Sequence, residues 1–169
     1  MLKKHREVSP KVVSCKVITV SDTRDEQTDK SGQLMKQMLA DNQHYLANYE
    51  IVKDEKTEIE AAISSGVQDE QMDAILINGG TGIAKRDVTI EVVDSFLDKK
   101  MPGFGEIFRM LSYQYDIGSA AILSRAIAGV TDNTVIFSVP GSSGAVKLAM
   151  EKLILPEIGH IVMELNKDN

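Results

Sequence analysis

The stretch DAILINGGTGIAKRDVT, residues 73–89, decides the fold. Its first six residues are mostly branched and apolar, which is typical of a strand buried on both faces. Three glycines follow directly, and from Thr89 to Leu97 the apolar residues recur at helical spacing. A buried strand, a glycine-rich turn and an amphipathic helix predict one unit of a parallel α/β sheet.

The same alternation continues on both sides of this stretch. Parallel strands need crossover helices, so the pattern predicts an α/β protein with three αβα layers and a mostly parallel central sheet. Predicted N-caps are Ser31, Thr57 (with Glu60 at capping-box spacing) and Asp87. The predicted elements are strands over 12–20, 49–52 and 134–139, helices over 32–40, 57–64 and 145–154, a further apolar run over 120–123, a break at 102–105 before another helix, and an interruption at Pro156.

Composition excludes several classes of protein. The chain has 169 residues with 19 Lys+Arg and 25 Asp+Glu, so its formal charge of −6 disfavours a nucleic-acid binder. A single cysteine, Cys15, excludes an internal disulfide and a cysteine-rich zinc site, and it reads as an inert buried thiol. No apolar run is long enough to cross a membrane. We expect a cytoplasmic protein with one domain over 1–169, of which 1–10 forms a flexible segment.

Polar or glycine-rich segments follow the predicted strands at 21–23, 53–55, 79–82 and 140–144. In a parallel sheet the ligand crevice lies beyond the carboxyl ends of the strands. We therefore expect these four segments to lie together on one rim.

The segment 79–89 has features of a phosphate site. Glycines allow close backbone approach, successive N–H groups can face an anion, and Lys85 and Arg86 add two cations. Neither the Walker nor the dinucleotide glycine pattern is present. The alternative is a tight turn with a solvated Lys-Arg pair.

Asp54 and Asp87 are candidate ligands of Mg²⁺. Each alone is more typical of a turn or a cap, but on a rim with a phosphate loop the two carboxylates suit a metal that also binds substrate phosphates. Asp22 and Glu55 compete for the same role, and the sequence alone does not rank them.

Two further loops are candidates. Phe104, between Gly103 and Glu106, is expected to be exposed, and with the following helix it is a candidate subunit contact; a helix cap is the simpler interpretation of Glu106. Arg125, after Ser124, can clamp an anion or form a surface ion pair.

Together these motifs resemble the MoaB/Mog family of molybdenum-cofactor biosynthesis proteins, and the length and the stretch 103–112 are most similar to the MoaB branch. The resemblance covers nearly the whole chain, from about Val12 to Pro156. It rests on four stretches in the family's order and spacing: GGTG with RDVT at 79–89, MPGFGE at 101–106, LSR at 123–125 and VPGS at 139–142.

The resemblance implies a molybdopterin-binding fold assembled as a homo-oligomer, either a trimer or a hexamer. It also implies an activity, the adenylylation of molybdopterin by Mg-ATP with release of pyrophosphate, and contact with other proteins of the pathway. The family's two essential aspartates match Asp54 and Asp87, which are lost in members that do not adenylylate. The remaining expected substrate-binding residues are Ser21, Asp22, Ser31, Gly32, Gly79, Gly80, Thr81, Gly82, Lys85, Arg86, Gly103, Phe104, Glu106, Ser124, Arg125, Pro140, Gly141 and Ser142.

Three other functions stay open. A pterin carrier or scaffold without chemistry is the leading alternative, and the presence of Asp54 and Asp87 argues against it. An NAD-type oxidoreductase is weakened by the broken dinucleotide fingerprint. A structural α/β domain does not account for four functional loops on one rim.

Overall fold

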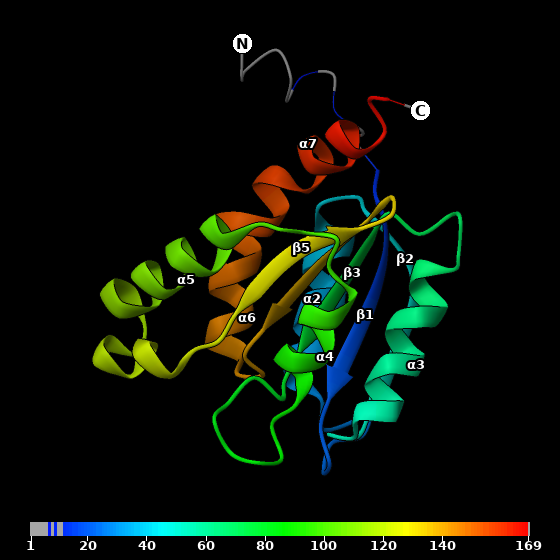
Figure 1. Ribbon diagram of the computed structural model, residues 1–169. Helices are drawn as coiled ribbons and strands as arrows, with labels where there is room; N and C mark the ends of the chain where they lie inside the picture. The colour runs from blue at the N-terminus through cyan, green and yellow to red at the C-terminus, as the bar shows by residue number, and fades with distance from the viewer. Residues whose placement is uncertain (1–6, 8, 10–11, 169) are drawn as a thin grey trace.

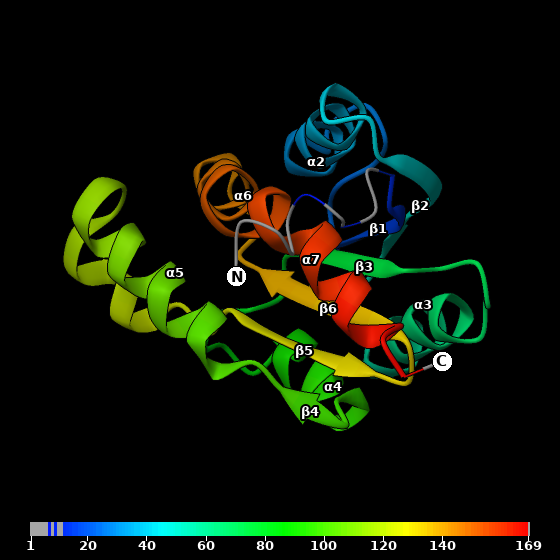
Figure 2. The same ribbon diagram turned by 90° about the horizontal axis from the view of Figure 1, so that it is seen from above.

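The computed structural model describes residues 7, 9 and 12–168, so the predicted N-terminal segment 1–10 lies outside the described residues apart from residues 7 and 9. Six strands form one sheet in the order β2-β1-β3-β6-β5-β4 (Figures 1 and 2). The first four are parallel, β5 is antiparallel to β6, and β4 is antiparallel to β5. The strands are β1 (Ser14–Val20), β2 (Tyr45–Val52), β3 (Ala74–Asn78), β4 (Lys99–Lys100), β5 (Ile127–Thr131) and β6 (Thr134–Val139).

Helices cover both faces of the sheet (Figure 2). Helices α2, α5, α6 and α7 pack on one face, and α3 and α4 pack on the other. The predicted three-layer αβα architecture is therefore confirmed. The helices are α2 (Lys30–Asp41), α3 (Lys56–Val67), α4 (Thr89–Phe96), α5 (Pro102–Tyr115), the 3₁₀ helix η1 (Gly118–Leu123), α6 (Ser143–Ala149), the π-helix η2 (Met150–Ile154) and α7 (Leu155–Leu165).

The central strands are apolar on both faces because each face has its own core. Val17 and Ile18 are neighbours in β1 and both are fully buried, yet they belong to different apolar clusters. In β3, the neighbours Leu76 and Ile77 likewise belong to different clusters, one on each face of the sheet. Since full burial of such a side chain contributes about 1.5–3 kcal/mol, these runs hold the sheet at the centre of the molecule.

The helix caps differ from those predicted. Asp29, not Ser31, caps α2, and its carboxylate accepts from the N–H of Gly32. Thr57 lies inside α3, which begins without a side-chain cap, and Val88 rather than Asp87 precedes α4. The Asp87 carboxylate instead accepts from the N–H of Ala84 at 3.0 Å, so it closes the preceding turn.

The chain between α4 and β6 also departs from the sequence pattern. The predicted break at 102–105 is the first turn of α5, where Pro102 is tolerated because its missing N–H has no helical acceptor. The apolar run 120–123 lies in η1, and the antiparallel strands β4 and β5 were not predicted. Helix α5 and η1 extend outward beside β5 (Figures 1 and 2).

The chain stays helical from α6 through α7, so the predicted interruption at Pro156 is wrong. The π turn η2 precedes this residue, and the Leu155 N–H bonds the Met150 carbonyl five residues back. This wider turn accommodates a proline that cannot donate a helical hydrogen bond. Among the described helices, none is both long enough and apolar enough to cross a bilayer.

Candidate functional site

A cavity of about 510 Å³ lies at the carboxyl ends of β1, β2, β3 and β6. Each of the four segments that were expected to share one rim contributes at least one residue to its wall. Segment η1, with the two residues around it, closes another side. The lining residues are Val20, Ser21, Asp22, Thr23, Arg24, Asp54, Gly79, Gly80, Thr81, Gly82, Ile117, Ala120, Leu123, Ser124, Pro140 and Gly141.

The 79–82 loop offers hydrogen-bond donors to this cavity. The Gly80 carbonyl accepts from the Thr89 N–H, and the carbonyls of Thr81 and Gly82 accept from Arg125. In the described part of the chain, the N–H groups of Gly80, Thr81 and Gly82 have no acceptor. The loop thus turns its acceptors to the protein and keeps three successive donors free, as in an anion-binding nest.

Arg125 holds this loop in place. Its Nε donates to the Thr81 carbonyl at 3.2 Å, and its Nη2 donates to the carbonyls of Gly82 at 2.6 Å and Asp87 at 3.3 Å. Its Nη1 forms an ion pair with Glu91. Since its donors already contact the protein, the structure gives Arg125 the role of a brace for the loop.

Asp54 carries a buried oxygen without a partner. Its Oδ1 and the Thr89 Oγ1 are both buried and unpaired within the described chain, and both lie beside Gly80. A Cβ on Gly80, whose φ is +66°, would lie 2.1 Å from Thr89 Oγ1 and 2.7 Å from Asp54 Oδ1. Burial, followed by the charges of Asp22 and Asp87, raises the pKa of Asp54, while Arg86 opposes the rise. A bound cation would pair with this buried oxygen and offset the repulsion between the neighbouring carboxylates.

Arg86 pairs with two carboxylates near Asp54. Its Nε and Nη2 donate to both oxygens of Asp22, at 2.8 and 3.0 Å, and its Nη1 pairs with Glu55 at 2.8 Å. Asp22 also accepts the Asp54 N–H at 3.1 Å. The hydrogen bond from Arg86 is the main reason that the pKa of Asp22 is lowered. Asp22 and Arg86 thus tie the loop after β1 to the loop after β2.

The two candidate metal ligands lie near each other, but only one of them lines the cavity. Asp87 is close enough for its charge to raise the pKa of Asp54. Asp54 lines the cavity, whereas Asp87 packs under Gly82, where a Cβ would lie 2.6 Å from Asp87 Oδ2. Within the described residues, no group of three His, Cys, Asp or Glu side chains is arranged to hold a metal ion.

Several expected binding residues do not line the cavity. Ser31 and Gly32 are buried beside Asp29, and Ser142 caps α6 by accepting from the Ala145 N–H. Lys85 is exposed on the loop before α4. Gly103, Phe104 and Glu106 lie on α5: Gly103 and Glu106 are exposed, and Phe104, which was expected to be exposed, packs against Phe108 and Phe137 in the core. Arg86 and Arg125 also lie outside the lining and contact the protein instead.

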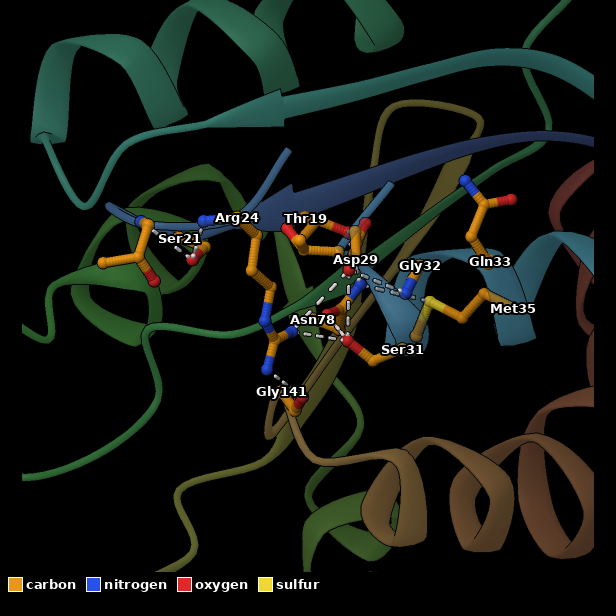
Figure 3. A network of polar contacts seen from close by, with 12 residues as sticks. Thr19, Ser21, Arg24, Asp29, Ser31, Gly32, Gln33, Met35, Asn78 and Gly141 are labelled. Carbon is orange, nitrogen blue, oxygen red and sulfur yellow. Dashed lines mark hydrogen bonds and ion pairs between the residues drawn. The ribbon is translucent and has the colours of Figure 1, made fainter. Parts of the chain in front are cut away.

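The sequence reasoning missed Arg24. It lines the cavity, and its guanidinium spans from Ser31 to the Gly141 carbonyl (Figure 3). The available signal was its position in the polar loop directly after β1, three residues beyond Ser21. Ile117, Ala120 and Leu123 were missed because η1 follows a helix rather than a strand of the sheet.

Residues 16–160 match the sequence pattern of a protein family described as "Probable molybdopterin binding domain". The chain belongs to this molybdopterin-binding family. It is 60% identical over 167 residues, which cover 99% of it and 98% of the relative, to the molybdenum cofactor biosynthesis protein B of Bacillus subtilis (strain 168). It is 56% identical over 167 residues, with the same coverage, to the protein of that name from Halalkalibacterium halodurans.

Solved structures agree with this assignment to the molybdopterin-binding family. A crystal structure of a molybdenum cofactor biosynthesis protein B superposes with a TM-score of 0.91 at 59% identity, covering 94% of this chain and 99% of that one. The tungsten cofactor synthesizing protein MoaB from Pyrococcus furiosus gives a TM-score of 0.83 at 38% identity, covering 92% and 98%. The resemblance to the MoaB/Mog family is therefore confirmed, together with the fold that it implies.

Proposed function

We propose that the protein acts in molybdenum-cofactor biosynthesis and adenylylates molybdopterin, using Mg-ATP and releasing pyrophosphate. The observation that carries the proposal is the pairing of two unsatisfied features in one cavity. Within the described residues, the N–H groups of Gly80, Thr81 and Gly82 are free to bind phosphate oxygens, and the buried Asp54 Oδ1 beside them lacks a partner. A site built for both a phosphate and a cation suits chemistry on a metal-bound nucleotide.

The residues present fit Mg²⁺ as part of a substrate complex. Asp54 offers a partnerless oxygen, and the nearby negative charges of Asp22 and Asp87 that raise its pKa also attract a cation. Mg²⁺ ordinarily takes one or two carboxylates together with substrate phosphates. Asp54, assisted by Asp87, would hold it, and the metal would neutralise charge on the phosphoryl oxygens.

The reaction needs no general base from the chain. An oxygen of the pterin phosphate is already ionised near neutral pH, and it forms a bond to the α-phosphorus of ATP while the bond to the bridging oxygen of pyrophosphate breaks. Positioning and charge stabilisation then dominate the barrier. The free amides of residues 80–82 would orient the phosphate, and Arg125 would keep these amides in place through the loop carbonyls.

Turnover by purified protein tests the proposal. With molybdopterin and Mg-ATP, the wild type is expected to release pyrophosphate, and Asp54→Asn and Asp87→Asn are each expected to abolish release while retaining pterin binding. Asp69→Asn is the matched control, because this exposed aspartate lies in the loop before β3, at the opposite end of the sheet. Binding of the pterin without pyrophosphate from the wild type would instead favour the carrier or scaffold function.

We also propose that the protein is a homo-oligomer, a trimer or a hexamer, that assembles through α5 and η1. Large apolar side chains are exposed on these outward-reaching helices, and Ile122 is 82% and Tyr115 75% accessible. Ile117 and Leu123 belong both to this surface and to the cavity wall. A second copy covering the surface would therefore also shield one side of the cavity from water.

A further inference from the structure

The residues around Arg24 form a buried polar network that the proposed reaction does not use (Figure 3). At its centre the fully buried Asp29 accepts from Thr19 Oγ1 and Tyr49 Oη, both at 2.6 Å. It also accepts from the Gly32 N–H at 3.0 Å, and Ser31 Oγ lies 3.3 Å from it. Burial raises the pKa of Asp29, but these hydrogen bonds and the charge of Arg24 outweigh it and leave the pKa lowered. Asp29 is therefore a fixed negative charge beneath the cavity.

This network orients the Arg24 guanidinium. Arg24 Nη1 donates to Ser31 Oγ at 2.6 Å and lies 3.7 Å from Asp29 Oδ1. Ser31 is itself fixed, because its hydroxyl bonds Asn78 Oδ1 at 2.9 Å. Two elements far apart in sequence, the end of β3 and the start of α2, thus set the position of one cationic group.

The other side of the guanidinium contacts only a neutral hydrogen-bond acceptor. Arg24 Nη2 donates to the Gly141 carbonyl at 3.0 Å, which is a neutral acceptor. Arg24 Nε and the remaining N–H groups have no acceptor within the described chain, and the side chain keeps a third of its surface accessible. A guanidinium binds an oxyanion more strongly than a carbonyl and presents its N–H groups as a fork.

Arg24 also differs from the other cations near the site. Of the described residues that line the cavity, it is the only lysine or arginine, whereas Arg86 and Arg125 are engaged by carboxylates and loop carbonyls. The acidic residues Asp22 and Asp54 line the cavity as well. The cavity therefore combines a carboxylate group suited to a cation with a single guanidinium suited to an anion.

The guanidinium lies where the two glycine loops meet. A Cβ on Gly141 would lie 3.1 Å from the Gly79 Cα and 3.6 Å from Arg24 Nη1. The free amides of residues 80–82 begin one residue beyond this contact. A ligand with two phosphoryl groups, or two phosphorylated ligands side by side, can thus contact the amides with one group and Arg24 with the other.

We propose that Arg24 is the anion-binding side chain of the cavity, and that it exchanges the Gly141 carbonyl for a phosphate oxygen of the bound ligand. This inference rests on the proposed function for the nature of the ligands, since it deepens the same site. The shared chemistry is a phosphate oxyanion, which either the nucleotide or the pterin can supply.

Equilibrium binding in EDTA tests this role without turnover. Arg24→Gln is expected to reduce the affinity for the phosphorylated ligand about 10- to 100-fold. The affinity for the same ligand without its phosphate should not change. ATP against adenosine and molybdopterin against its dephosphorylated form are the two arms, and the arm that loses affinity identifies the source of the phosphate. Arg24→Lys should give an intermediate loss, because it keeps the charge and loses the fork.

Arg109→Gln is the matched control, because Arg109 also donates to a backbone carbonyl, that of Ala126 at 3.3 Å, but lies outside the cavity. Thr19, Tyr49 and the Gly32 N–H still donate to Asp29 when Arg24 is replaced, so the fold should persist, and circular dichroism checks this. Equal losses with and without the phosphate, no loss in either arm, or no binding by the wild type would each overturn the proposal. If Arg24→Gln loses affinity only for the phosphorylated ligand but the wild type releases no pyrophosphate in the turnover assay, the anion-binding role of Arg24 stands and the proposed adenylyltransferase activity is wrong.

Discussion

Asp54 Oδ1 occupies space that a side chain on Gly80 would need, 2.7 Å from the position of its Cβ. Thr89 Oγ1 lies even closer to that position, at 2.1 Å, and the Gly80 backbone has a φ of +66°. The residue that permits the loop to turn is thus also the residue that lets the carboxylate approach. The glycine at this position is required by both sterics and backbone conformation.

Gly80→Ala should therefore be strongly destabilising, by about 2–4 kcal/mol, because a positive φ and two clashes act together. Thermal and urea unfolding of the purified variant measure the loss. Gly103→Ala is the control, since a Cβ there meets nothing within 4 Å and alanine favours the first turn of α5. Similar unfolding midpoints for the two variants would contradict this interpretation of Gly80.

Asp54→Asn should make the protein more stable at pH 7, by about 1–3 °C in Tm. The folded state raises the pKa of Asp54, so the ionised carboxylate disfavours folding at any pH above that pKa. The gain should shrink as the pH falls and the wild-type Asp54 takes up its proton. Calorimetry of both proteins from pH 7 to pH 4 checks the sign, and a lower Tm for the variant at pH 7 would refute it.

Arg125→Gln should loosen the 79–87 loop and destabilise the protein by about 2 kcal/mol, because several loop carbonyls lose a charged donor. Arg125→Lys should recover only part of this, since the three donors of an ammonium sit on one nitrogen and cannot span the loop carbonyls as the planar guanidinium does. Hydrogen exchange at residues 80–89 reports the loosening directly. Unchanged hydrogen exchange in both variants would show that Arg125 does not hold the loop in place.

Cys15 should resist alkylation in the folded protein. Burial, with a smaller contribution from the charge of Asp73, raises the pKa of its thiol to about 12. Iodoacetamide at pH 8 should label it only in denaturant, as followed by mass spectrometry. Because the unfolded thiol ionises at about 9.0, the protein should also lose stability above that pH, and Cys15→Ser should reduce this loss. Rapid labelling of the native protein would contradict the prediction.

Ile122→Glu should reduce the molecular mass of the assembly in solution, because it places a charge on the exposed apolar surface of η1. Tyr45→Ser is the control: this residue is 61% exposed on β2, at the opposite edge of the sheet from β4. Light scattering after size-exclusion chromatography separates the outcomes. An unchanged mass for Ile122→Glu, or a monomeric wild type, would exclude assembly through this surface.

The sequence predicted the parallel core of the fold well, because its signals are local. The runs around Val17 and Leu76 are apolar on both faces, and each is followed by polar or glycine residues that mark the strand end. The antiparallel edge was missed for a physical reason. Strand β5 is short and contains Gly129, which is needed because a Cβ there would lie 2.5 Å from the Lys99 carbonyl of β4, and such a contact between strands leaves no local pattern.

The candidate site was only partly predictable. The segments that surround the cavity follow strand ends, so topology alone brings Asp22, Asp54 and Gly80 together. Charge pairing is not visible in one dimension, and so Arg86 and Arg125 were expected to face a ligand although both are bound by the protein. Arg24 is oriented by Ser31 at the start of α2, which in turn bonds Asn78 at the end of β3, and no local pattern records such an arrangement.

Strand β4 has only two residues, Lys99 and Lys100, and both are exposed. Such a short, lysine-bearing edge strand has almost no unpaired backbone groups to which a strand of another molecule could hydrogen-bond. Edge-to-edge pairing of two sheets at β4 is therefore disfavoured by both charge and length. The proposed assembly on this side of the molecule would therefore use helices, whose side chains can form a closed set of contacts with a defined number of copies.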